Sequence, residues 1–415
     1  MITFQKPSNC VDLKDHASLQ AAVDAVPEHG TLFVPPGRWR CGAARLKSNM
    51  TLHLARGAEL IAPEKVEEHI SNDVFQRATG ISRCFLALFN VENVTIEGEG
   101  TLNGNGHVFW PDYDGRPNTV ERDPATGFFS PGVYKSVFPR PTLLISFRSR
   151  NITLRNIRIR NSASYTVWMV GCQNVRIDSI DLENIRRGPN TDGLDVDCCQ
   201  DVWITRCRLA AGDDAIALKS DTDLLKEDLA CERIHITGNT LSSHCCAVRL
   251  GYEGDGFIRD VIMTDNIIHD ANIGLDMLAV LPEKERRKTF GIRKGSRIEN
   301  ILIRGVTMRN VRQAVKLWNW VTEKEDLPRL EGFIRNVTLA DMQIEAVDAS
   351  FIGGKNVSAI HLENIRMDVK RFPEACRGAE AVQLPTVWGR GYMKEPLTLY
   401  QVRDLTMKNV HITES

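Results

Sequence analysis

Three aspartates in two short motifs are the residues of this chain best suited to chemistry. Asp192 lies in the motif NTDG, which begins at Asn190, and Asp213 and Asp214 lie in the motif GDD. A single aspartate in a turn usually binds backbone amides. Carboxylates gathered in one patch instead raise the pKa of at least one member, because like charges repel. Glycoside hydrolysis needs that combination, with one protonated carboxyl as acid and one ionised carboxylate as base or nucleophile.

A recurring pattern must position these motifs. The pattern is Asn or Asp, apolar, any, apolar, two of any kind, apolar, any, apolar, and clear copies begin at Asn151, Asn174, Asp201, Arg233, Asp260, Asn300, Asn336, Ala359 and Asp404. Each copy predicts two short alternating strands joined by a polar kink, without helical spacing. Recurrence of this kind is typical of a solenoid of stacked coils. The sequence therefore predicts an all-β fold, a parallel β-helix.

Two other repeat folds fit less well. A β-propeller needs four strands in each repeat of about 40 to 50 residues, whereas the shortest spacing here leaves room for two or three. A leucine-rich repeat would show its LxxLxL signature, which the sequence lacks. In a β-helix, the 21 positions from Asp192 to Asp213 are about one coil, so we expect the three carboxylates to emerge on the same side.

The prediction for the domain organisation is one β-helix domain over residues 1–415. Residues 1–48 would form an N-terminal cap with the first strands, and residues 49–415 would form coils, with inserted loops near 107–141 and 281–299. The cap would hold a short amphipathic helix, because Leu19, Ala22, Val23 and Val26 share one helical stripe. The Asn-x-Ser/Thr sites fall in repeat positions, so we interpret them as turn residues; they are Asn49, Asn93, Asn151, Asn336 and Asn356.

Composition narrows the partners. Lysine and arginine number 52 against 53 acidic residues, so charge gives no argument for a nucleic-acid partner. The N-terminus lacks the pattern of a signal peptide and no apolar run approaches a membrane span, so we expect a cytoplasmic protein without a membrane partner. The 11 cysteines include two adjacent pairs but not the CxxC spacing, so we expect buried thiols, no metal and no cofactor.

The motifs resemble those of the polygalacturonase-type glycoside hydrolases of family 28. The matching segments are NTDG, GDD with the following AIALKS, a histidine at His244 in SSHCCAVRLG, and the N-terminal runs SLQAAVDAVPEHGTLFVPPG and GEGTLNGNG. The resemblance covers most of the chain. It implies a right-handed parallel β-helix and inverting hydrolysis of galacturonate-containing pectin, with an oligosaccharide as partner.

The resemblance also implies roles for the residues of the motifs. Asp213 would be the general acid, Asp192 and Asp214 would activate the hydrolytic water, and His244 would support the acid. The residues by themselves indicate an acid and a base without saying which aspartate is which. Because no export signal is visible, we expect removal of sugars from one end of short oligosaccharides.

The sequence departs from the family pattern around these residues. His244 is flanked by Ser243 and Cys245 where the family has glycines, and GLDML from Gly274 places Asp276 and Leu278 where the family has an Arg-x-Lys pair. The candidate substrate-binding residues are Asn190, Lys219, Arg249, Asp276, Lys316 and Trp318, with Trp110 and Trp320 as further rings for a sugar. A basic run over 282–297 either meets an anionic sugar or forms a solvated loop.

Two other functions remain open at this point. A polysaccharide lyase or uronate epimerase could use the same fold, although it would need a base or Ca²⁺ beside the substrate carboxylate. A non-catalytic carbohydrate-binding β-helix could use the aspartates as turn residues only.

Overall fold

The structure is a computed structural model that describes residues 9–71, 83–116, 118–123, 127–129, 132–319, 330–370, 393 and 395–415. The chain forms two compact units. The first unit consists of Met1–Asn118, Val133–Asp195 and Cys199–Asp213, and the second of Thr119–Gly132, Val196–Cys198 and Asp214–Ser415. The single domain over 1–415 stays a prediction. Trp320 lies outside the described residues.

The first unit is a stack of short parallel strands with a helix at its N-terminal end. Its helical segments are α1 (Leu19–Ala25), η1 (Leu13–Asp15), η2 (Val66–Glu68) and η3 (Gly106–Phe109). Its strands are β1 (Cys10–Asp12), β2 (Gly30–Val34), β3 (Gly37–Arg40), β4 (Ala44–Arg45), β5 (Met50–Leu54), β6 (Ala58–Ile61), β7 (Ile70–Ser71), β8 (Arg83–Phe89), β9 (Glu92–Gly98), β10 (Thr101–Asn103), β11 (Thr142–Phe147), β12 (Arg150–Arg155), β13 (Arg158–Arg160), β14 (Val167–Val170), β15 (Gln173–Asp178), β16 (Asp181–Glu183), β18 (Gln200–Thr205) and β19 (Arg208–Ala211).

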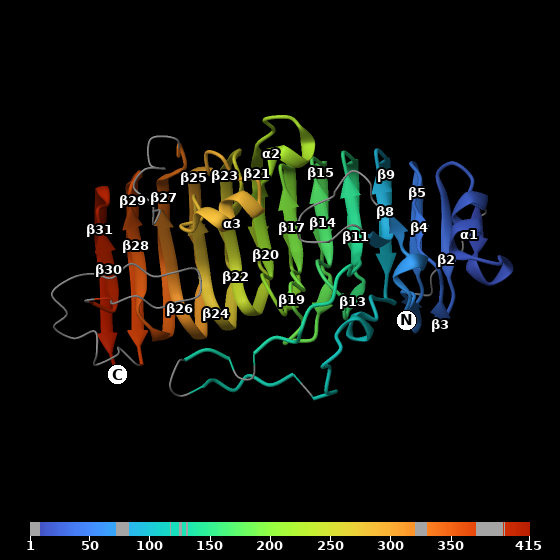
Figure 1. Cartoon of the computed structure of the whole chain (residues 1–415), viewed down its shortest axis with the longest axis horizontal. Helices are drawn as coiled ribbons and strands as arrows, with labels where there is room; N and C mark the ends of the chain where they lie inside the picture. Colours follow the sequence, from blue (N-terminus) through green and yellow to red (C-terminus); the bar gives the residue numbers. More distant parts are fainter. Residues whose placement is uncertain are drawn as a thin grey trace. The chain divides into compact units, whose positions relative to one another are not determined.

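The second unit is also built from stacked parallel strands, and several of its strands are longer than those of the first unit. Its strands are β20 (Ile216–Ser220), β21 (Cys231–Thr237), β22 (Thr240–Gly254), β23 (Phe257–Thr264), β24 (Ile267–Leu278), β25 (Arg297–Arg304), β26 (Thr307–Asn319), β27 (Phe333–Asp348), β28 (Ser350–Gly354), β29 (Val357–Val369), β30 (Leu397–Tyr400) and β31 (Arg403–Glu414). Two short helices, α2 (Thr222–Leu225) and α3 (Lys284–Thr289), lie between strands, and β17 (Leu194–Asp197) contributes to both units. Figure 1 shows β22, β24 and β26 following one another in the stack, and each pairs in parallel with the next.

Aliphatic ladders form the core of both units. In the first unit, Val94, Ile152, Val175 and Val202 occupy equivalent positions on β9, β12, β15 and β18, and all four are buried. Side chains alternate between the two faces of a strand, so the apolar positions of the repeat all point inward. In the second unit, equivalent positions on β21, β23, β25, β27 and β29 hold Ile234, Val261, Ile301, Val337 and Ile360. The periodic pattern therefore predicted the core correctly.

The polar residue that opens each repeat makes the turn. Asn93, Asn151 and Asn174 have φ between 54° and 57°, in the left-handed region that asparagine tolerates better than most residues. Their side-chain amides also form a chain of hydrogen bonds, in which Asn174 donates to Asn151 at 2.7 Å and Asn151 donates to Asn93 at 2.8 Å. The interpretation of the Asn-x-Ser/Thr sites as turn residues is confirmed, because Asn49, Asn336 and Asn356 adopt the same conformation.

The predicted N-terminal helix is present as α1. Ser18 caps it by accepting a hydrogen bond from the Ala21 amide, and the predicted stripe, including Leu19 and Val23, is buried. The predicted loop near 107–141 is also present, since the described residues between η3 and β11 form no long helix or strand. Among the described residues, no helix is long and apolar enough to cross a membrane.

Candidate active site

In the first unit, the NTDG and GDD turns are held together by a close backbone contact. The Gly212 amide donates to the Thr191 carbonyl at 3.3 Å. A Cβ on Gly212 would lie 2.2 Å from the Thr191 hydroxyl oxygen and 2.7 Å from the Gly188 carbonyl oxygen, so only glycine fits there. The contact explains the glycine ahead of the two aspartates. It also places Asp213 directly after the point where this coil meets the coil that carries Asp192.

Asn190 links Asp213 to a buried cation. Its amide nitrogen lies 3.3 Å from the Asp213 carboxylate, and its amide oxygen accepts a hydrogen bond of 2.8 Å from Arg140. Arg140 is fully buried and also donates to the carbonyls of Ala163 and Pro189. Burial lowers the pKa of Arg140 to about 10, although the charges of Asp192 and Asp213 oppose the shift.

The sequence did not identify Arg140. It lies in the non-repeating segment just before β11, where no motif marks it. Its contacts place a cation beside Asn190, where its charge interacts with Asp192 and Asp213. Asn190, a predicted substrate-binding residue, contacts Asp213, and its role toward a substrate stays a prediction.

In the second unit, Asp214 is paired with Arg249. Arg249 Nε lies 2.9 Å from one Asp214 oxygen, both side chains are buried, and the other Asp214 oxygen accepts the Cys246 amide at 3.3 Å. Burial acts to lower the pKa of Arg249, but the neighbouring Asp214, Cys246, Cys245 and Asp276 outweigh it and raise the pKa well above its ordinary value. Arg249 is therefore a permanent cation that favours the ionised form of Asp214.

His244 lies on an irregular part of β22. The pairing of β22 with β24 shifts register between Ser243 and Cys246, and the Cys245 amide donates to the Ser243 hydroxyl at 2.8 Å. The His244 ring packs against Phe129 with 5.5 Å between centroids, and its carbonyl accepts a hydrogen bond from Asn272. The strand irregularity replaces the glycines that the family pattern has on either side of this histidine.

Arg122 and Phe129 lie close to His244 in the second unit. Arg122 donates to the Asn272 side chain at 3.3 Å and to the Asn310 side chain at 3.1 Å, and its guanidinium lies 4.1 Å from the centroid of Phe129. Phe129 thus brings an aromatic ring of the loop near 107–141 into contact with His244. Trp110, the aromatic that the sequence favoured, is instead buried against Tyr134.

Three candidate binding residues, Arg249, Asp276 and Lys316, lie at equivalent positions on three adjacent strands. The register of β22, β24 and β26 aligns Arg249 with Asp276 and Asp276 with Lys316. Arg249 lies 3.6 Å from Asp276, and Asp276 also accepts a hydrogen bond of 3.0 Å from the Trp318 indole. Lys316 lies 4.3 Å from the centroid of the Trp318 ring. The acid at the position of the family's arginine is thus neutralised by cations on both neighbouring coils.

All the candidate cations of the second unit are buried. Lys219 is 3.3 Å from Glu253, and both are buried, while Lys316 and Trp318 are fully buried. Buried side chains of this kind support the wall of a site rather than offering a surface for a sugar. Their direct contact with a substrate stays a prediction.

A buried lysine makes stability depend on pH. Burial lowers the pKa of Lys316 to about 8, with Asp276 opposing the shift and Arg312 adding to it. Because this value lies below that of the unfolded chain, about 10.4, the unfolded state binds more protons between the two values. We expect the free energy of unfolding to rise by about 3 kcal/mol from pH 8 to pH 10.4 through this group. Denaturant unfolding of Lys316→Met across this range should lack that rise; an equal pH dependence would contradict the assignment.

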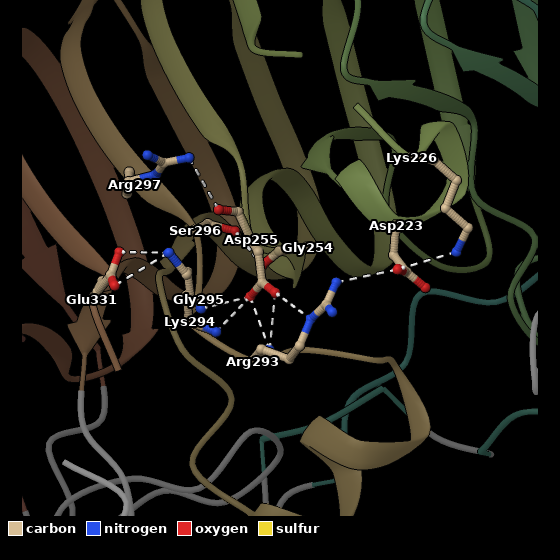
Figure 2. A network of polar contacts seen from close by, with 10 residues as sticks. All are labelled: Asp223, Lys226, Gly254, Asp255, Arg293, Lys294, Gly295, Ser296, Arg297 and Glu331. Carbon is tan, nitrogen blue, oxygen red and sulfur yellow. Dashed lines mark hydrogen bonds and ion pairs between the residues drawn. The ribbon is translucent and has the colours of Figure 1, made fainter. Parts of the chain in front are cut away.

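The basic run over 282–297 is neutralised by acids of its own unit. Figure 2 shows Asp255 at the centre, where it accepts hydrogen bonds from the backbone amides of Arg293, Lys294 and Gly295. The side chains of the run pair with further acids, as in Arg293 with Asp223, Lys294 with Glu331 and Arg297 with Asp228. These contacts favour the interpretation as a structural loop over that of a sugar-binding patch.

We expect Asp255→Ala to loosen this loop. The carboxylate binds three consecutive amides at 2.8–3.0 Å, so its loss should cost about 2 kcal/mol of stability. Limited trypsin digestion should then cut within 286–297 faster than in the wild type. Asp228→Ala is the matched control, because Asp228 is an exposed carboxylate that pairs with the Arg297 side chain and binds no backbone amide of the run among the contacts described, so its loss should cost less than about 1 kcal/mol. Equal cleavage rates in the two variants would contradict the role of Asp255.

One group of possible metal ligands in the second unit lies against a cation. Asp214, Cys245 and Cys246 offer ligand atoms within 4.8 Å of one another in the second unit. The Arg249 guanidinium already lies 2.8 Å from Cys246 Sγ and 2.9 Å from Asp214. A metal ion at these three residues would therefore have to compete with the Arg249 guanidinium for the same ligand atoms.

Comparison with known proteins identifies the family. Residues 64–315 match the family model of glycosyl hydrolases family 28, which is more than half of the chain. The chain belongs to glycosyl hydrolase family 28. It is thus a polygalacturonase-like glycoside hydrolase, as the motifs around Asp192, Asp213 and His244 predicted.

Individual relatives are distant. A probable polygalacturonase from Vitis vinifera is 26% identical over 88% of this chain and 74% of its own length. An exo-poly-alpha-D-galacturonosidase from Dickeya chrysanthemi is 26% identical to this chain. The matched region covers 62% of this chain and 48% of that protein. The crystal structure of a hyperthermoactive exopolygalacturonase from Thermotoga maritima has a TM-score of 0.68 at 24% identity, with 88% of both chains covered. The likeness of the structures confirms the right-handed parallel β-helix.

Proposed function

We propose that this family 28 hydrolase removes sugars from the end of pectin-derived oligosaccharides with inversion of the anomeric centre. Asp213 is the general acid, Asp192 and Asp214 activate water, and His244 supports the acid. The observation that carries the proposal is the unequal environment of two consecutive aspartates. Asp213 is hydrogen-bonded to the neutral amide of Asn190, whereas Asp214 is paired with the buried Arg249.

The different environments of Asp213 and Asp214 suit two different roles, one as acid and one as base. A guanidinium stabilises a carboxylate, so Asp214 is suited to remain ionised and to accept a proton from water. Asp213 has the neutral amide of Asn190 as a hydrogen-bond partner, and in this proposal it is the group that gives a proton to the leaving oxygen. In the reaction, water attacks the anomeric carbon, its proton passes to the carboxylate, and the glycosidic oxygen leaves with the proton of the acid.

Action on chain ends is supported by relatives and by the loop beside His244. Two of the similar proteins carry exo-acting names, the exo-poly-alpha-D-galacturonosidase and the exopolygalacturonase. In the second unit, Phe129 packs against His244, and Arg122 binds Asn310. Side chains held beside His244 in this way would limit the length of chain that passes the site.

The sugar next to the cleaved bond is either a uronate or a neutral sugar. Arg249 is engaged by Asp214 and Asp276, and Asp276 stands where the family has an arginine. Asp276 supplies no cation to hold a uronate at this position, so a pectin-derived oligosaccharide with a neutral sugar there is the second candidate substrate. Family membership supports hydrolysis over the lyase and over the non-catalytic interpretation.

The test is a panel of short oligogalacturonides and mixed pectic oligosaccharides with neutral sugars. We expect release of single sugars from one end, and an initial product of inverted anomeric configuration in proton NMR. Release of mid-sized fragments would overturn the exo mode. A retained configuration would overturn the inverting mechanism. A product with a carbon–carbon double bond that absorbs ultraviolet light, formed without the incorporation of water, would favour a lyase.

A further inference from the structure

Two adjacent thiols lie against the candidate catalytic residues of the second unit. Cys245 Sγ and Cys246 Sγ are 3.7 Å apart and are not joined by a disulfide. The pair is buried with Ile273, Cys246 completely and Cys245 with 5% of its surface exposed. The reaction described above does not use either sulfur.

The strand irregularity brings the two thiols together. Consecutive side chains of a regular strand point to opposite faces. Here the register shifts between Ser243 and Cys246, and the Cys245 amide binds the Ser243 hydroxyl. Both sulfurs therefore reach the same cation, since Arg249 Nη2 lies 2.8 Å from Cys246 Sγ and 3.4 Å from Cys245 Sγ.

The other adjacent pair of cysteines has separate partners. Cys198 Sγ contacts the Asp197 carboxylate at 3.6 Å, and Cys199 Sγ contacts the Met169 carbonyl at 3.4 Å. That pair is an internal comparison within the same chain. Its two thiols are adjacent in sequence but make their contacts with different groups.

We propose that Cys245 and Cys246 form a reversible disulfide when the protein meets a peroxide, and that this disulfide turns the hydrolase off. The partly exposed Cys245 thiol reacts first with hydrogen peroxide and gives a sulfenic acid and one water. The Cys246 sulfur then attacks that sulfur, which forms the S–S bond and releases a second water. Two thiols and one peroxide thus yield one disulfide and two waters, and a dithiol reductant reverses the change.

The neighbouring cation favours the first step, while burial slows the second. A guanidinium beside a thiol stabilises the reactive thiolate. Burial raises the pKa of Cys246, and Cys245 and Arg249 only partly oppose the rise. We therefore expect oxidation over minutes at millimolar peroxide rather than an immediate reaction.

The disulfide would disturb Arg249 and Asp214. An S–S bond of about 2.05 Å requires the sulfurs to approach by more than 1 Å from 3.7 Å. The Cys246 amide, which binds Asp214, and the sulfurs, which bind Arg249, move with them. Displacement of a catalytic group by about 1 Å can cost about 100-fold in rate, so we expect kcat to fall at least 10-fold.

The experiment treats the full chain with hydrogen peroxide and follows mass and activity together. The tryptic peptide 234–249 contains Cys245 and Cys246 as its only cysteines, and the peptide 188–206 contains Cys198 and Cys199. We expect a loss of about 2 Da in the first peptide and not in the second, with return of mass and activity after dithiothreitol. The variants Cys245→Ser and Cys246→Ser should lose the reversible inactivation, measured for each variant against its own activity before peroxide is added.

The outcomes separate this inference from the proposed function, on which only its activity part rests. An unchanged mass of peptide 234–249 overturns the disulfide whatever the substrate is. A disulfide formed without loss of turnover overturns the regulation. Equal inactivation of wild type and both serine variants also overturns it, because oxidation then acts elsewhere. If no substrate of the panel is turned over, the mass change and a shift of the melting temperature still test the disulfide.

Discussion

Asp213→Asn is expected to lower kcat on natural oligosaccharides by about 10²- to 10⁴-fold, the usual contribution of a general acid. The isosteric amide keeps the hydrogen-bonding shape of the side chain beside Asn190 but cannot supply the proton. Steady-state kinetics on the oligosaccharide that the wild type cleaves would measure the loss. Unchanged turnover would remove Asp213 from the reaction.

Activity on aryl glycosides distinguishes the variant that lacks the acid from the variant that lacks the base. A good aryl leaving group needs little protonation, so Asp213→Asn should retain much more activity on such a substrate than on an oligosaccharide. Asp192→Asn should lose activity on both, because water must be activated in either case. Asp260→Asn is a matched control, since Asp260 opens a repeat with φ of 53°, and asparagine fills that position in other coils. A similar loss in the control would point to a folding defect.

Arg249→Met is expected to lower the free energy of unfolding by about 3–5 kcal/mol, the cost of removing one partner from a buried ion pair. Arg249 is buried between Asp214 and Asp276, and its removal leaves both carboxylates inside the protein without this cation. Urea unfolding followed by circular dichroism would measure the change. The variant should also lose turnover, because Asp214 loses the charge that keeps it ionised.

Two comparisons make the Arg249 prediction specific. Arg309→Met removes an exposed arginine paired with Glu345 at 3.6 Å and should cost less than about 1 kcal/mol. The double variant Arg249→Met with Asp276→Leu should recover part of the lost stability, because one buried carboxylate is removed with the cation. Equal costs for Arg249→Met and Arg309→Met, or no recovery in the double variant, would contradict the buried network.

Much of the fold was predictable because the repeat is local. Alternating apolar residues predicted the ladders through Ile152 and Val261, and the asparagine that opens a repeat predicted the turn. Both depend on backbone conformation over a few residues, which the residue types themselves favour. The two aspartate motifs were also recognisable, because Gly212 and Asn190 serve turns whose geometry requires those types.

The charges around the site were not predictable in the same way. Arg140 binds Asn190 across 50 positions, and Arg122 binds Asn310 across 188, so no local pattern links the partners. Coil lengths vary from repeat to repeat, and that variation decides which side chains align on neighbouring rungs. The acids that bind the basic run over 282–297, such as Asp255, are likewise distant from it in sequence, so only the tertiary structure shows these pairs.

The sequence alone therefore determined the class of fold, the turn residues and the aspartates that carry the proposed reaction. The tertiary structure decided which cation meets which acid, that Asp276 is neutralised by the coils on either side of it, and that a strand irregularity brings Cys245 and Cys246 against Arg249. The physical reason is that strand and turn preferences act within a few residues, whereas ion pairs form between rungs whose alignment depends on the intervening loops.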